Sequence, residues 1–153
     1  MAQGMGAVRA AAPTLLLPLL LAGCGGDGGS KTRGSVGGPL PACAGAGPAS
    51  GLPAAFPAGF PLPQGTVIER TRKEGGFSVA EGYVAGDLEA TADYFREEFP
   101  SAGYELGEGD AEKHEAETEF EGNGVDGRLK LRSVDGCEGA LSLSLAAMRS
   151  PGA

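Results

Sequence analysis

Two short segments of alternating residues constrain the fold more than any other part of the sequence. Every second residue of 115–121 is a glutamate, and every second residue of 128–132 is basic. A period of two is typical of a β-strand with one buried and one solvated face. The dipeptide Asn123-Gly124 lies between the segments, and Asn-Gly is typical of a two-residue hairpin turn. The sequence therefore predicts an antiparallel hairpin.

Placing Asn123 and Gly124 in the turn fixes the register of this hairpin. The register gives each of three glutamates one basic partner: Glu119 with Arg128, Glu117 with Lys130, and Glu115 with Arg132. On the other face, Thr118 lies opposite Leu129, and a slip of one residue would spoil both faces. We expect solvated ion pairs, each worth under about 1 kcal/mol. A calcium site needs six to eight oxygens at one point, which a linear row does not supply.

Hydrophobic periodicity and turn residues predict the remaining elements. A helix begins after the N-cap Asp87 and ends near Pro100 and Gly103. Its apolar residues form one stripe at helical spacing: Leu88, Ala92, Phe95 and Phe99. Further strands are expected over 67–71, 77–84, 104–106 and 140–146. We therefore predict an α+β fold, with a single antiparallel sheet of about five to six strands. The chain order is ββα and then a meander, with the one helix packed on one face of the sheet.

The first 24 residues carry an export pattern. One basic residue, Arg9, precedes a leucine-rich apolar run that is too short for a bilayer span but long enough for a signal peptide. The run ends in Leu21-Ala22-Gly23-Cys24, which resembles the lipobox of bacterial lipoproteins. The resemblance implies cleavage between Gly23 and Cys24, a diacylglyceryl group on the Cys24 thiol, and an acyl chain such as palmitate on the new amino group. It thus implies a lipid anchor on the extracytoplasmic face of a cell membrane.

Composition then divides the chain into four parts. Residues 1–23 are expected to be the lipoprotein signal peptide, and 24–59 a flexible tether rich in Gly, Pro, Ala and Ser. Residues 60–148 are expected to form the small α+β domain, and 149–153 a disordered tail. Within the tether, Phe56 is a candidate docking point on the domain.

The three cysteines of the chain fit an anchor and a pair. Cys24, Cys43 and Cys137 show no CxxC spacing, so zinc-finger and thioredoxin patterns are absent. If Cys24 carries lipid, the exported environment favours a disulfide between Cys43 and Cys137, with two free thiols as the alternative.

Net charge argues against several classes of partner. The chain carries a net charge of −8. Nucleic-acid binding is expected to show a basic stripe, and docking on anionic lipid needs clusters of Lys and Arg. We therefore expect no nucleic-acid partner, and membrane association through the lipid alone.

No group of residues predicts catalysis, a metal or a cofactor. Residues 122–127 match the letters GxGxxG, but that fingerprint must join a strand to a helix, and strands are expected on both sides here. His114 is the single histidine, and it is expected to be exposed at a strand start. A nucleophile needs a base that a third group holds in place, and nothing marks His114 as that base. The chain is therefore not expected to be an enzyme.

The candidate functions that remain are binding functions. Tyr94-Phe95 in the helix and Ala102-Gly103-Tyr104 after it resemble small uncharacterised lipoproteins of GC-rich bacteria, to which no activity is attached. We expect an envelope interaction or accessory module that presents a sheet face or the helix edge to a protein partner. The alternative is a small-ligand carrier or sensor, with a pocket between helix and sheet lined by Tyr94 and Tyr104. An apolar cavity there would favour the carrier. A filled core with an exposed apolar patch would favour the interaction module.

Overall fold

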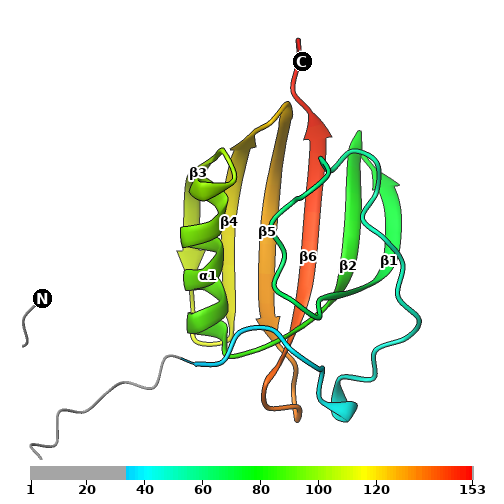
Figure 1. Cartoon of the computed structure of the whole chain (residues 1–153), viewed down its shortest axis with the longest axis vertical. Coiled ribbons are helices and arrows are strands. Elements are labelled where there is room, and N and C mark those ends of the chain that lie inside the picture. Colours follow the sequence, from blue (N-terminus) through cyan, green and yellow to red (C-terminus); the bar gives the residue numbers. More distant parts are fainter. Residues whose placement is uncertain (1–33, 153) are drawn as a thin grey trace, which may run out of the picture. The chain divides into compact units, whose positions relative to one another are not determined.

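The computed structural model describes residues 34–152, which form one antiparallel six-stranded sheet with a single α-helix (Figure 1). The order across the sheet is β1-β2-β6-β5-β4-β3. This architecture confirms the predicted α+β class. The proposed signal peptide and Cys24 lie outside the described residues. The elements are η1 (Ala42–Ala44), β1 (Val67–Glu74), β2 (Phe77–Ala85), α1 (Leu88–Ser101), β3 (Tyr104–Ala111), β4 (Glu115–Gly122), β5 (Val125–Ser133) and β6 (Ala140–Arg149).

The last strand of the chain joins two halves of the sheet. β1 and β2 form a hairpin on one side, and β3, β4 and β5 form a meander on the other. β6 pairs with β2 through Ala80 opposite Leu145, and with β5 through Leu129 opposite Leu145. Residues far apart in the sequence therefore become neighbours across the centre of the sheet.

The helix starts and packs as its sequence predicts. The Asp87 side chain accepts a hydrogen bond from the Ala90 N–H (3.1 Å), which satisfies one of the free donors of the first turn. Phe95 and Phe99 are buried against the sheet, while Leu88 and Ala92 pack at the edge of the core. The helix covers the β3–β5 half of one sheet face (Figure 1).

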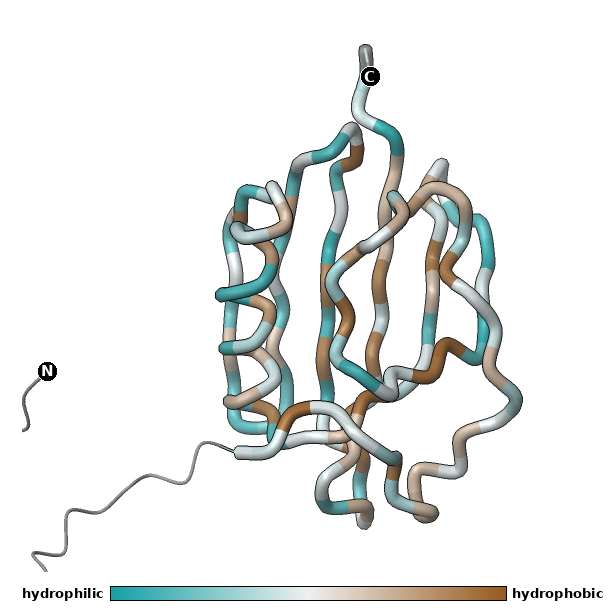
Figure 2. Tube along the Cα trace, viewed as in Figure 1, coloured by the Kyte–Doolittle hydropathy of each residue, from teal (hydrophilic) through white to brown (hydrophobic). Residues whose placement is uncertain are grey.

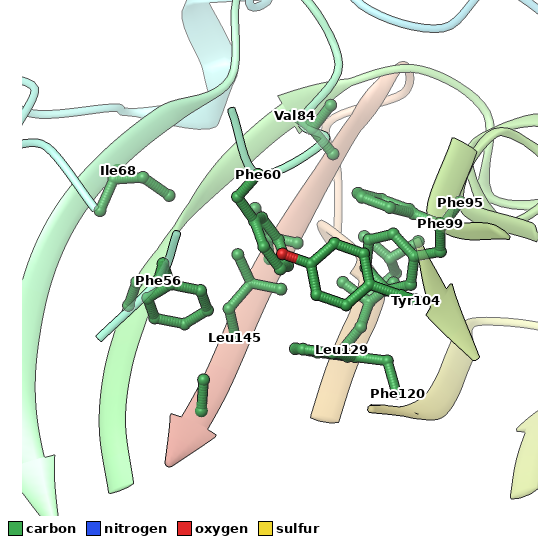
Figure 3. Close-up of a cluster of buried hydrophobic side chains, with 14 of the residues drawn as sticks. Phe56, Phe60, Ile68, Val84, Phe95, Phe99, Tyr104, Phe120, Leu129 and Leu145 are labelled. Atoms are coloured by element: carbon green, nitrogen blue, oxygen red, sulfur yellow. The ribbon is translucent and has the colours of Figure 1, made fainter. Parts of the chain in front are cut away.

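An aromatic cluster fills the core on this face. Phe60 lies with its ring centroid 5.5 Å from those of Phe99, Tyr104 and Phe120 (Figure 3). Figure 2 shows hydrophobic and hydrophilic residues alternating along β5, which separates this core face from an outer, solvent-facing side.

The packed chain begins earlier than the composition predicts. Residues 34–59, expected to belong to a flexible tether, run along the sheet and contribute Phe56 to the core, where it is 6% exposed. The Gly37 N–H donates to the Ala85 carbonyl (2.8 Å), and the Ser50 N–H donates to the Ile68 carbonyl (2.5 Å). Long-range hydrogen bonds and aromatic burial therefore order a segment that looks flexible by composition.

Two further boundaries differ from the prediction. β3 reaches Ala111 instead of residue 106, with a bulge between Leu106 and Gly109. β6 includes Arg149, and Ser150 binds the β4–β5 turn through its N–H to the Gly124 carbonyl (3.0 Å). The predicted tail 149–153 therefore starts with one residue of β6, Arg149, and one residue that hydrogen-bonds the β4–β5 turn, Ser150. Pairing with the neighbouring strand accounts for both extensions.

Candidate functional site

Cys43 and Cys137 form a disulfide, which confirms the predicted pair. Their Cα atoms are 5.5 Å apart and their separation in sequence is 94 residues. Cys137 packs with Ala44 and Ala140 in a small apolar cluster of its own, at the end of the sheet where β2 ends. The bond ties the segment before β1 to the β5–β6 loop.

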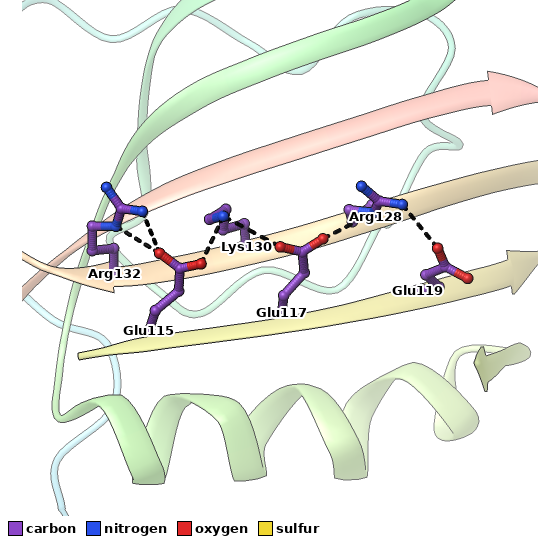
Figure 4. Close-up of polar contacts among 6 residues, drawn as sticks. All are labelled: Glu115, Glu117, Glu119, Arg128, Lys130 and Arg132. Carbon is purple, nitrogen blue, oxygen red and sulfur yellow. Dashed lines mark hydrogen bonds and ion pairs between the residues drawn. The ribbon is translucent and has the colours of Figure 1, made fainter. Parts of the chain in front are cut away.

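The outer face of the sheet carries the ion pairs in the predicted register (Figure 4). Three contacts join directly opposite residues: Arg128 to Glu119 at 2.9 Å, Lys130 to Glu117 at 3.3 Å, and Arg132 Nε to Glu115 at 2.7 Å. Two diagonal contacts connect these pairs: Arg128 to Glu117 at 3.0 Å and Lys130 to Glu115 at 2.7 Å. We call these six side chains the charge ladder. They alternate in sign and neutralise one another across β4 and β5.

The charge ladder favours the ionised forms of Glu115 and Lys130. Hydrogen bonds from Lys130 and Arg132 lower the pKa of Glu115 below its ordinary 4.5. Hydrogen bonds that Lys130 donates to Glu115 and Glu117 raise the pKa of Lys130 above its ordinary 10.5. Both shifts stabilise the charged forms, so neither Glu115 nor Lys130 is suited to proton transfer near neutral pH.

The GxGxxG segment and His114 lie at opposite ends of β4. Asn123 and Gly124 have positive φ angles of 50° and 76°, as a hairpin turn requires, and the flanking elements are β4 and β5. His114 is exposed beside this sheet, and its carbonyl accepts from the Ser133 N–H (2.9 Å). Across residues 34–152, no three His, Cys, Asp or Glu side chains gather as metal ligands.

A hollow of about 640 Å³ opens on the outer face at the end of the sheet away from the disulfide. Its floor is apolar and comes from β2 and β6, and its rim carries five acidic residues and one basic residue. The floor comprises Phe77, Val79, Ala146 and Met148, and the rim includes Glu74, Glu105, Glu119, Glu121, Asp126 and Arg128. We call this feature the outer hollow. The sequence prediction missed it because strands distant in sequence supply its floor.

Three carboxylates of the rim lie in one row. Glu105 is opposite Glu121 across β3 and β4, and Glu121 is opposite Asp126 across β4 and β5. Within the described part of the chain, no basic side chain forms an ion pair with any of the three. Asp126 accepts a hydrogen bond from the Ser150 hydroxyl (2.8 Å). Glu121 thus follows the glutamates of the charge ladder along β4, but both of its neighbours across the strands are acidic.

A second, smaller cleft lies between the helix and the sheet. Its volume is about 310 Å³, and small residues such as Ala92, Ala111 and Ala116 face it and leave it unfilled. Phe95, Leu129 and Leu131 supply much of its apolar wall.

The two tyrosines expected to line a pocket between helix and sheet do not line this cleft. Tyr104 is 3% exposed within the aromatic cluster, and Tyr94 packs edge-on against Phe95 with ring centroids 5.4 Å apart. Burial, with a smaller contribution from Glu98, raises the pKa of Tyr94.

No protein-family model, curated protein or solved structure matches this chain. Between residues 34 and 152, no helix combines the length and apolar character needed to cross a bilayer. The features that bear on function are therefore the outer hollow, the cleft and the sequence before residue 34.

Proposed function

We propose that this chain is a lipid-anchored, extracytoplasmic interaction module that binds an envelope protein through the outer hollow. The observation that carries the proposal is an apolar floor on the solvent-facing side of a sheet whose other side already has a filled core. Apolar groups gathered in a concave, water-exposed site gain free energy when a partner covers them. The hollow has a volume in the range of specific binding sites.

The position of the hollow suits an anchored protein. The segment from Ser35 to Gly37 binds the sheet where β2 ends, through the Ala85 carbonyl and the bridge to Gly86. Phe77 begins the same strand, so the hollow lies about 26 Å away along β2. A partner can approach that end without crossing the point at which the chain enters from its N-terminal side.

Photo-cross-linking in the producing cell tests the interaction. A photoreactive residue replaces Met148 in the floor of the hollow or, as the matched control, Ser142 on the same strand and face. We expect one discrete protein adduct from position 148 and none from position 142. Absence of an adduct at 148, or equal adducts at both positions, would contradict the proposed function.

A separate substitution tests the anchor. The Cys24→Ser variant lacks the thiol that would carry lipid, so we expect it to leave the membrane fraction in a salt wash. Cys43→Ser removes a different cysteine and is the matched control, which should stay in the membrane fraction. Retention of the Cys24→Ser variant would argue against lipid anchoring.

The cleft beneath α1 supports a second candidate function, the carriage or sensing of a small apolar ligand. Apolar residues form much of the wall of this cleft, which Arg96, Asp110 and Glu117 also line, and a cleft of this size can take a small aromatic molecule when its walls are preformed. Titration with naphthalene, followed by amide NMR shifts, should perturb residues around Ala92 and Ala116. Ala116→Leu fills the cleft and should abolish those shifts, whereas Ala146→Leu on the outer face should leave them unchanged. Shifts that survive Ala116→Leu would reject this candidate.

A further inference from the structure

We infer that the outer hollow accepts a basic, amphipathic polypeptide segment, with cationic side chains over the Glu105–Glu121–Asp126 row and an apolar side chain on the floor. This inference rests on the proposed function and names the chemistry of the partner. Both halves of the recognition, charge and apolar contact, are present side by side on the same sheet face.

The expectation of cationic groups in the partner follows from the point at which the ion pairs of the charge ladder stop. β4 presents four glutamates outward, and three of them lie opposite a basic residue of β5. The fourth, Glu121, lies opposite Asp126, and its other neighbour across the strands is Glu105. Like charges directly opposite one another are destabilising in a sheet. Cationic groups from a partner would remove that repulsion, and the break coincides with the outer hollow.

The apolar floor lies beside the Glu105–Glu121–Asp126 row, on the next two strands of the sheet. Asp126 is opposite Met148 of β6, and Phe77 begins the next strand beside it. Val79, although it points to the outer side, is only 5% exposed and forms the base of the floor. Acidic and apolar groups therefore occupy successive strands, which is the pattern that a segment with basic residues beside large apolar ones would match.

The length of the row favours a polypeptide over a small amine. From β3 through β4, β5 and β6 to β2 there are four strand spacings, which span about 19 Å. An extended segment of roughly six residues covers that distance at about 3.3 Å per residue. Anionic lipid and nucleic acid would meet carboxylates and be repelled.

A peptide titration tests the inference on the full chain bearing Cys24→Ser. The probe is a capped hexapeptide of three lysines followed by three leucines, and affinity is measured at low and high salt. Replacing two carboxylates of the row, in Glu121→Gln with Asp126→Asn, should weaken binding about fivefold or more. The matched control, Glu112→Gln with Glu138→Gln, removes the same charge at the other end of the sheet and should change affinity less than about twofold.

The apolar half has its own test. Phe77→Ser should also weaken binding of the lysine–leucine peptide, and a peptide of six lysines should bind the unsubstituted chain more weakly. Equal loss in both double variants, equal affinity for the two peptides, or binding of Ca²⁺ at the row without binding of peptide would overturn the inference. So would a failure of the lysine–leucine peptide to bind.

The two proposals fail separately. A cross-link at position 148 without binding of the peptide overturns the basic, amphipathic partner and leaves the interaction module standing. Loss of the cross-link overturns the interaction module, whatever the peptide does.

Discussion

Glu115 shows how single side chains stabilise the outer face. Its carboxylate accepts hydrogen bonds from Lys130 and from Arg132 on the neighbouring strand. The side chains are only partly buried, so the contact owes its strength mainly to two cations held in register by the backbone. The cost of protonating Glu115 therefore depends on the fold.

The pH dependence of stability should report this contact. Because the pKa of Glu115 is lower in the folded state than its ordinary 4.5, its contribution to stability is present above that value and is lost as the pH falls through the folded-state pKa. When the pH falls from about 6 to about 3, the free energy of unfolding should decrease less for Glu115→Gln than for the unsubstituted protein. Urea denaturation followed by circular dichroism measures the difference. Parallel pH profiles for the two proteins would contradict it.

Gly127 leaves room for the ring of Phe120, which lies opposite it across β4 and β5. A Cβ at this position would overlap the ring of Phe120 and approach the Ala146 carbonyl oxygen at 2.6 Å. Phe120 belongs to the aromatic cluster, so the ring has little room to move.

Gly127→Ala should therefore destabilise the protein by about 1–3 kcal/mol through overpacking. Gly51→Ala is the control, because a Cβ at position 51 has open space around it. Thermal unfolding of the two variants is the measurement. A loss no larger than that of the control would show that the core adjusts to the added methyl group.

Among the elements, those with local signals could be predicted from the sequence. The α1 helix has an N-cap and one apolar stripe, and the β4–β5 hairpin has alternation and an Asn-Gly turn. β3 was predicted too short because its second half, Gly107–Ala111, is poor in residues with β-propensity. It extends because β4 offers a partner edge.

The outer hollow could not be predicted in the same way. Phe77 and Met148 are adjacent only because β6 inserts between β2 and β5, and this strand order is a long-range property. The alternation in 115–121 shows that Glu121 points outward, but its lack of a countercharge depends on Glu105, whose strand neighbour the sequence left open. Pairing across distant strands has no local signature.

The segment before β1 should depend on the disulfide for its order. Replacing both cysteines, in Cys43→Ala with Cys137→Ala, removes a constraint on a long loop of the unfolded chain and should cost about 2–5 kcal/mol. The unsubstituted protein measured with a reductant should unfold at the same urea concentration as the double variant. A double variant as stable as the oxidised protein would show that aromatic burial alone orders the segment.

At the scale of the whole molecule, Phe60 connects parts that are distant in sequence. Its ring contacts α1 through Phe99, β3 through Tyr104 and β4 through Phe120 (Figure 3). The segment before β1 and the rest of the domain should therefore unfold together.

Phe60→Ala should lower the free energy of unfolding by about 3–5 kcal/mol while leaving a single transition. Phe77→Ala removes an equally large ring from the outer hollow, where it lies outside the core, and should cost about 1 kcal/mol or less. Denaturation curves of both variants give the comparison. Two separate transitions for Phe60→Ala would show that the segment folds independently.

Gly34 packs beside Asp87, and this contact would limit the distance between the domain and a bilayer if the proposed lipid is present on Cys24. If Cys24 carries lipid, only ten residue steps separate it from Gly34, beside Asp87. Ten residue steps reach at most about 33–36 Å. The domain would then stay within a thin layer above the leaflet that holds the lipid. A partner confined to the same layer would encounter it at an effective concentration far above the cellular average.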